Sequence, residues 1–163
     1  MLRRAVFVLS VLVATSSFAQ QSPFRVSAFV SSPQNGLGAA IEYRWAPRWA
    51  LELAASSEKH KLTIGGIFNG HVIEFRTRPI NLTVHYYFVN ATRWQPYLGG
   101  GVRRVTSSSS EISDRTSAEV DGGLHFMVTP SFSVRLDGKG RIGSDNVSYD
   151  PDFKTSLGVS WRF

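Results

Sequence analysis

The sequence predicts an all-β fold, namely an eight-stranded antiparallel up-and-down transmembrane β-barrel. Three observations support this prediction. Apolar and polar residues alternate with a period of two through almost every segment after residue 20, which is the pattern of strands that have one apolar face. Short and longer connections between these segments also alternate, as an up-and-down barrel requires. Finally, the tryptophans fall at segment ends beside the short connections.

Eight segments show the alternation. We expect strands at residues 24–30, 37–45, 49 to beyond 57, 72–88, 94–105, 117–128, 132–142 and 153–163. The short connections are 46–48, 90–93 and 129–131, and the longer or more polar ones are 31–36, 58–71, 106–116 and 144–152. The alternation slips near Pro79, because Ile73 and Phe75 are out of phase with Ile80. A proline at such a slip indicates a β-bulge or the membrane boundary.

The last segment, 153–163, has the pattern of a strand that faces lipid. Its apolar face carries Thr155, Leu157, Val159, Trp161 and Phe163. This ending resembles the closing strand of bacterial outer-membrane β-barrels, in which a terminal Phe is part of the signal that the assembly machinery reads. The resemblance implies that Phe163 acts as an assembly signal.

Four tryptophans occupy strand ends on the side of the short connections: Trp45, Trp49, Trp94 and Trp161. Indole prefers the head-group region of a membrane, where its ring is buried and its N–H stays hydrated. In a soluble core, most of these residues would lie in the middle of strands. We therefore predict that they form a lipid-interface girdle, with the short turns in the periplasm.

The N-terminus has the layout of a secretory signal peptide. Two arginines precede the apolar run Ala5–Ala14, and Ser17-Phe18-Ala19 supplies the small residues of a cleavage site. The run is too short to cross a bilayer as a helix. We predict that residues 1–19 are removed and that residues 20–163 form the outer-membrane β-barrel domain; a retained anchor is the alternative. Periplasmic chaperones and the barrel-assembly machinery would then be partners during biogenesis.

Composition excludes several function classes. The formal net charge is +6, there is no cysteine, and the mean hydropathy of −0.09 is not that of a helical membrane protein. The absence of cysteine excludes disulfides and thiolate chemistry. Lysine and arginine are scattered along the strands, so we expect no nucleic-acid partner. Attraction to anionic lipid head groups explains the same charge better. We expect a monomer.

The inward faces of the predicted strands carry charges of both signs. The predicted lumen charge network comprises Arg25, Glu42, Arg44, Glu52, His85, Glu119, Asp121, Arg135, Asp137, Lys139, Arg141 and Arg162. Arg25 and Arg162 become neighbours when the barrel closes, and Glu42 or Glu52 is expected to neutralise them. An eight-stranded barrel is only wide enough to be filled by side chains or to hold one small ligand. The network therefore indicates either a salt-bridged, filled lumen or a narrow polar passage with a gate.

The sequence contains no recognisable catalytic motif. His85 and His125 point inward by phase, and neither has a neighbouring serine in a known motif. Lipid A deacylases are barrels that place a Ser–His–acid set toward the lipid, so a lipid A-modifying enzyme is the less favoured alternative. His60 and His71 flank a hairpin tip, but two isolated imidazoles are weak evidence for a metal. We expect no enzymatic activity, no catalytic residue, no metal and no cofactor.

The hairpin around 58–71 has basic arms. These arms carry Lys59, Lys61, Arg76 and Arg78. Two interpretations are open: the cations line a solvated ribbon, or they contact the phosphates of lipopolysaccharide. On either interpretation the expected partners are outer-membrane lipid and lipopolysaccharide.

Two motifs resemble the OmpW family and, more loosely, the small OmpA-like and OmpX-like barrels. RPINLTVHYYF at 78–88 and QPYLGGGV at 95–102 are similar to the fourth and fifth strands of the OmpW family, and WALELAA at 49–55 and the final WRF at 161–163 are also similar. The resemblance implies a narrow, partly apolar channel for hydrophobic small molecules, which leave sideways into the membrane. The loops are shorter and the lumen more charged than in the family's pattern.

The predicted function is that of a non-enzymatic outer-membrane protein, either structural or forming a narrow channel for small, partly hydrophobic solutes. The alternative is a surface-exposed binding or adhesion barrel that acts through its extracellular loops.

Overall fold

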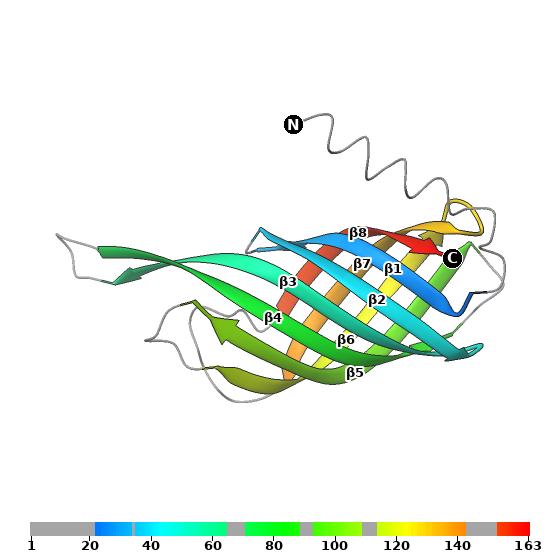
Figure 1. The fold of residues 1–163 in the computed structure, drawn as a ribbon, viewed down its shortest axis with the longest axis horizontal. Helices are drawn as coiled ribbons and strands as arrows, with labels where there is room; N and C mark the ends of the chain where they lie inside the picture. The colour runs from blue at the N-terminus through cyan, green and yellow to red at the C-terminus, as the bar shows by residue number, and fades with distance from the viewer. Residues whose placement is uncertain (1–21, 34, 65–70, 89–92, 109–113, 143–152) are drawn as a thin grey trace.

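Eight β-strands close into one antiparallel barrel in the computed structural model, in which each strand pairs with the next and β8 pairs with β1 (Figure 1). The structure describes residues 22–33, 35–64, 71–88, 93–108, 114–142 and 153–163. The strands are β1 (Phe24–Ser32), β2 (Gly36–Ala46), β3 (Trp49–Ile64), β4 (His71–Tyr87), β5 (Trp94–Ser107), β6 (Arg115–Met127), β7 (Phe132–Ile142) and β8 (Phe153–Arg162). The predicted fold class is confirmed. The predicted signal peptide, residues 1–19, lies outside the described ranges.

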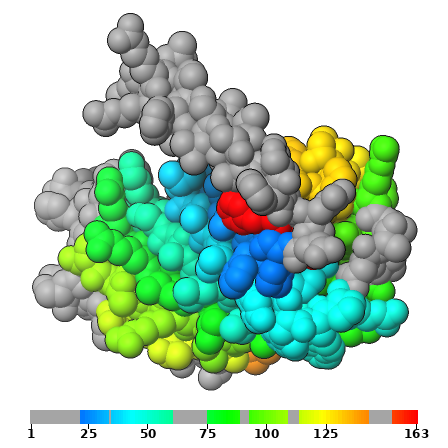
Figure 2. Space-filling view, turned by 45° about the vertical axis from the view of Figure 1, so that its right-hand side comes forward, coloured from blue at the N-terminus to red at the C-terminus, as the bar shows by residue number. Residues whose placement is uncertain are grey.

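The barrel closes through the pairing of its first and last strands. The register runs without interruption from Arg25 opposite Arg162 to Ser32 opposite Thr155. Beyond β8, the Phe163 amide donates to the Phe24 carbonyl at 3.4 Å, and the Ser22 amide donates to the Phe163 carbonyl at 3.1 Å. Figure 2 shows the end of β8 in red directly beside β1 in blue. In the described part of the chain, no helix is long and apolar enough to cross a membrane.

The wall of the barrel is apolar outside and polar inside, which is the reverse of a soluble protein. Leu53 and Leu82 point outward and are 48% and 43% exposed, whereas Glu52 and Thr83 beside them are fully buried. Successive side chains of a strand point to opposite faces, so the period-two pattern sorts the two kinds of residue. An apolar surface of this extent marks contact with a membrane or a partner.

The strand β4 keeps one phase through Pro79, so of the two interpretations of the slip, a β-bulge or the membrane boundary, the β-bulge is wrong. Phe75, Thr77, Pro79 and Asn81 are all buried, and the pairing with β5 continues through Pro79 opposite Val105. Phe75 differs from the expected pattern because this apolar ring points inward, where it stacks on His60 with a centroid distance of 5.1 Å.

Pro79 does interrupt the pairing of β4 with β3. The register passes from Ala55 opposite Ile80 to Glu58 opposite Thr77, and the two positions between them form no ladder pair. Proline has no N–H to donate to the neighbouring strand, which accounts for the gap. Beyond it, β3 and β4 pair again as far as Ile64 opposite His71 and project past the other strands (Figure 1). We call this end of the barrel the hairpin end and the opposite end the short-turn end.

Candidate functional site in the barrel lumen

The lumen near the short-turn end is filled by a cluster around Tyr87. Arg25 on β1 donates from Nη1 to the Tyr87 hydroxyl at 3.2 Å and to Glu42 at 3.3 Å, and from Nη2 to Gln95 at 3.4 Å. The Tyr87 hydroxyl itself donates to Glu42, and the guanidinium of Arg44 lies 4.0 Å above the Tyr87 ring centroid. Gln95 belongs to β5, which lies opposite β1 in an eight-membered ring of strands. This contact therefore spans the lumen.

A second bridge crosses the lumen at mid-height. Arg135 on β7 donates to Glu52 on β3, with one of the two bonds at 2.9 Å, and β3 and β7 are also opposite strands. The Nε of Arg135 donates to both oxygens of Asp137 at 2.8 and 2.6 Å. Tyr97 and Ser156 also donate to Asp137. Since Arg135 and Glu52 are essentially inaccessible to solvent, the two bridges together close this half of the barrel.

Two histidines, His85 and His125, lie in the same closed half, where each packs against Tyr97. His85 contacts Asp121 at 2.7 Å through Nε2 and lies 3.5 Å from Glu42 through Nδ1. Glu42, Glu52 and His85 bring three ligand atoms within 4.8 Å of one another, which is close enough to hold a metal ion. The carboxylates, however, are already engaged by Arg25 and Arg135, which oppose a further cation at this place.

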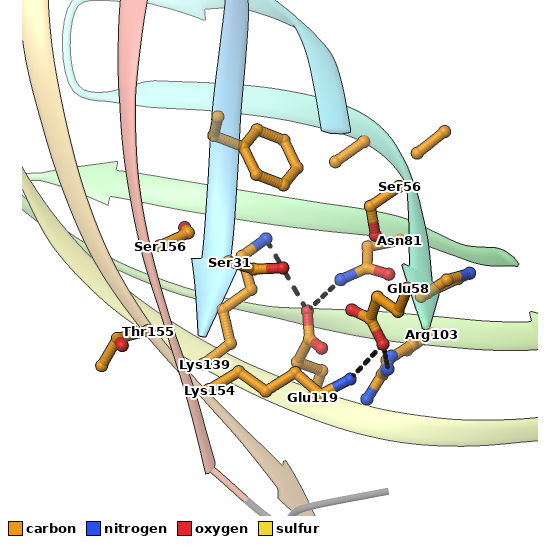
Figure 3. A pocket seen from close by; sticks show the side chains of 14 residues that line it. Ser31, Ser56, Glu58, Asn81, Arg103, Glu119, Lys139, Lys154, Thr155 and Ser156 are labelled. Carbon is orange, nitrogen blue, oxygen red and sulfur yellow. Dashed lines mark hydrogen bonds and ion pairs between the residues drawn. The ribbon is translucent and has the colours of Figure 1, made fainter. Parts of the chain in front are cut away.

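A pocket occupies the lumen toward the hairpin end (Figure 3). Its cavity volume is about 30 Å³, and the space between its lining atoms reaches about 400 Å³ when the part open to solvent is included. Lys154 and Arg103 approach Glu58 at 2.7 and 3.6 Å. Across the pocket, Asn81 donates to Glu119 at 2.7 Å, and Lys139 lies 3.9 Å from Glu119. The remaining wall is small or apolar and includes Phe29, Ala54, Ala55, Ser56 and Pro79.

The predicted lumen residues all lie on inward-facing positions, and most of them fall into the contacts described above. Arg25, Glu42 and Arg44 lie near Tyr87, and Glu52, Arg135, Asp137 and Lys139 form the bridge at mid-height. Arg141 is half-buried opposite Glu119. Arg162 is opposite Arg25 and donates to the Ser22 carbonyl at 3.3 Å. Glu42 is the carboxylate that contacts Arg25, whereas Glu52 pairs with Arg135.

Several lumen residues were absent from the predicted network. Glu58 falls within the predicted connection 58–71, although it has the same phase as Glu52 and Ala54. Lys154 has the same phase as Ser156 and could have been found in the same way. Tyr87 and Tyr97 carry no charge, so a search for inward charges does not find them, yet their hydroxyls join the ion pairs.

Aromatic side chains cluster on the outside near the short-turn end. The rings of Trp45 and Trp49 stack with a centroid distance of 6.5 Å, and Trp49 also meets Tyr86 at 5.0 Å. Trp94 packs on Phe126 at 4.5 Å, and Trp161 packs on Phe132 at 6.0 Å. Both this geometry and the position of Phe163 at the closing seam are compatible with the proposed interface girdle and assembly signal.

The sequence profile of the OmpW family matches residues 10–122, which is more than half of the chain. The chain belongs to the OmpW family. It is an outer-membrane β-barrel, as the family and the structural neighbours indicate. No curated protein shows significant sequence similarity to it.

Solved structures with the same fold include small outer-membrane barrels. OprG from Pseudomonas aeruginosa superimposes with a TM-score of 0.69 and 15% identity, over 89% of this chain and 98% of that chain. The N-terminal β-barrel domain of Pseudomonas aeruginosa OprF gives 0.64 and 18%, over 86% and 96%. Ail from Yersinia pestis gives 0.59 and 15%, over 88% and 100%. At these identities the likeness concerns the fold alone.

Proposed function

We propose that this OmpW-family protein is a non-enzymatic barrel that admits small, partly apolar solutes at its hairpin end and releases them sideways between β3 and β4. The proposal rests on one observation, which is that the pocket adjoins the gap in the pairing of β3 with β4. Ala55, Ser56 and Pro79 line the pocket, and the ladder of β3 with β4 is interrupted beside them. The hairpin end is taken as the extracellular side.

A straight route through the barrel is disfavoured by the two bridges across the lumen. Any solute that moved from the pocket toward the short-turn end would have to separate Arg135 from Glu52 and then Arg25 from Tyr87 and Gln95. Separating a buried ion pair costs several kcal/mol, because each charge would be left uncompensated. The pocket is therefore proposed to be closed toward the periplasm.

A sideways route requires weaker strand pairing and small side chains, and both occur at the same place. The missing ladder pairs lie at Ser56 and Ser57, and the adjoining wall residues Ala54 and Ala55 are small. Part of the pocket wall is charged, and the rest consists of small or apolar side chains. This combination suits a small molecule with one polar group and an apolar body.

The chemistry of the lumen supports the absence of enzymatic activity. Ser133 and His125 are 3.2 Å apart and resemble part of a hydrolytic site, but both are almost completely buried. They lie on the inward face, so lipid cannot reach them, and the bridge at mid-height separates them from the pocket. The alternative function, binding through extracellular loops, depends in part on residues 65–70, 109–113 and 143–152, which lie outside the described ranges.

A reversible cross-link across the gap tests the route. The register on both sides places Ser57 opposite Arg78, and both residues are exposed, so a Ser57→Cys/Arg78→Cys pair can form a disulfide in a chain that has no cysteine of its own. We expect cells that carry the oxidised variant to take up radiolabelled indole no faster than cells without the barrel, and reduction of the disulfide to restore uptake.

The matched control is Ser27→Cys/Ser160→Cys, whose hydroxyls are 2.8 Å apart across the paired seam of β1 and β8. Oxidation of this pair should leave uptake unchanged. Equal uptake by the oxidised and reduced forms of the gap variant would rule out a sideways exit.

A further inference from the structure

Four cations form a patch on the outer surface at the hairpin end of β3, β4 and β5. This basic patch consists of Lys59, Arg76, Arg78 and Arg104, all of which are exposed. Lys59 is directly opposite Arg76 in the register of β3 and β4, and Arg78 follows Arg76 two residues later on the same face. Arg104 on β5 is opposite Ile80 on β4, which places Arg104 beside Arg78. Three adjacent strands thus contribute to a single positive surface.

The patch begins where the lipid-facing band ends. Arg78 is two residues beyond Ile80 on the same face, and Arg104 is two residues beyond Val102; these apolar side chains are 48% and 51% exposed. Elsewhere at the hairpin end, the exposed residues that the structure describes are apolar, as at Leu37, Ile142 and Phe153, or polar without positive charge, as at Asp114 and Thr155. Within the described side chains, the exposed positive charge at the hairpin end is therefore confined to one arc of the rim, directly beyond the apolar band of the wall.

Three of the four cations of the patch have no carboxylate partner among the side chains that the structure describes. Lys59, Arg76 and Arg78 form no ion pair there, and Arg104 forms an exposed one with Asp114 at 3.3 Å. Glu58 beside Lys59 turns inward to Lys154. Like charges placed opposite each other across two strands are destabilising, so an anion between Lys59 and Arg76 would be favoured.

We propose that the basic patch binds the phosphate groups of a lipopolysaccharide molecule in the outer leaflet. Arginine forks match phosphate oxygens in bidentate geometry, and each cation near a lipid surface strengthens binding to anionic head groups. A lipid is the source of phosphate because the patch faces the membrane side of the wall. Lys61 is omitted, since the register places it opposite Glu74. This inference does not depend on the solute route.

The test compares two double variants that each remove two positive charges. Arg76→Gln/Arg78→Gln disrupts the patch, and Arg48→Gln/Arg93→Gln removes exposed arginines near the short-turn end. Each protein, folded in detergent micelles, is titrated with bis-phosphorylated lipid A, with its dephosphorylated form and with phosphatidylglycerol, and bound lipid is counted by native mass spectrometry. Heat-modifiable gel migration confirms that each variant is folded.

We expect the patch variant to bind bis-phosphorylated lipid A about 30-fold more weakly than the wild type, which corresponds to roughly 1 kcal/mol for each lost cation. The control variant should bind bis-phosphorylated lipid A like the wild type. The wild type should bind the dephosphorylated lipid weakly, with an affinity no higher than that of the patch variant for bis-phosphorylated lipid A. Unchanged binding by the patch variant would overturn the proposal. Equal binding of the dephosphorylated lipid or of phosphatidylglycerol by the wild type would also overturn it, and this comparison requires no variant.

Discussion

The bridge between Glu52 and Arg135 is predicted to be a major determinant of stability, and Glu52→Gln is the substitution that tests it. Both side chains are within 1% of complete burial, and the bridge joins opposite strands of the barrel. Removing one partner of a buried ion pair costs about 3–5 kcal/mol, because the other charge is left uncompensated. Arg135 would still contact both oxygens of Asp137, so the lower end of that range applies.

We therefore expect Glu52→Gln to lower the free energy of unfolding by about 3 kcal/mol. The measurement is urea-induced unfolding in lipid vesicles, followed by tryptophan fluorescence and by heat-modifiable migration. Asp114→Asn provides the control, because it breaks an ion pair of 3.3 Å whose side chains are 65% and 49% exposed. Exposed pairs contribute about 0–1 kcal/mol, so this variant should unfold almost like the wild type.

The double variant Glu52→Leu/Arg135→Met tests whether the loss of stability comes from an uncompensated charge. If the loss in Glu52→Gln comes from an uncompensated arginine, replacing both partners with apolar residues should cost less than the sum of the single substitutions. A loss below about 1 kcal/mol for Glu52→Gln would refute the reasoning, since Asp137 alone would then be sufficient for Arg135. Planar bilayers give a second measurement: the wild type should show no single-channel steps, because the bridge closes the lumen.

Two further predictions concern the wall and its seam. Pro79→Ala supplies the missing N–H, so β3 and β4 should pair without a gap, and indole uptake should fall toward that of cells without the barrel. The control Pro96→Ala on β5 should leave uptake unchanged. Wild-type uptake by Pro79→Ala would argue against the gap as an exit. Deletion of Phe163 should reduce the amount of barrel in the outer membrane several-fold while the refolded protein keeps its heat-modifiable migration, and normal outer-membrane levels would contradict its role in assembly.

The alternation of the sequence was sufficient to predict the strands and the direction of most side chains, because a residue in a barrel wall can point only inward or outward. The alternation could not predict which of the inward-facing charged side chains form ion pairs with one another. Glu52 and Arg135 are 83 residues apart, and their contact depends on the stagger of all eight strands. The alternation also gave the wrong direction for Phe75. The rule that apolar residues face lipid does not apply to the projecting part of β3 and β4, where Phe75 points inward and packs on His60.

The strand β4 contributes to three different features along its length: the closed half of the lumen, the pocket and the basic patch. Near the short-turn end, its inward residues His85 and Tyr87 take part in the closed half of the lumen. Higher up, Asn81 and Pro79 line the pocket, and Pro79 opens the ladder with β3. Beyond Ile80, the outward face changes from apolar to basic at Arg78 and Arg76. Since inward and outward residues alternate, the proposed solute exit and the proposed phosphate surface adjoin each other on the same strand. A lipopolysaccharide molecule held by the basic patch would therefore stand directly beside the gap, and disruption of the patch should alter solute uptake only if that lipid also controls access to it.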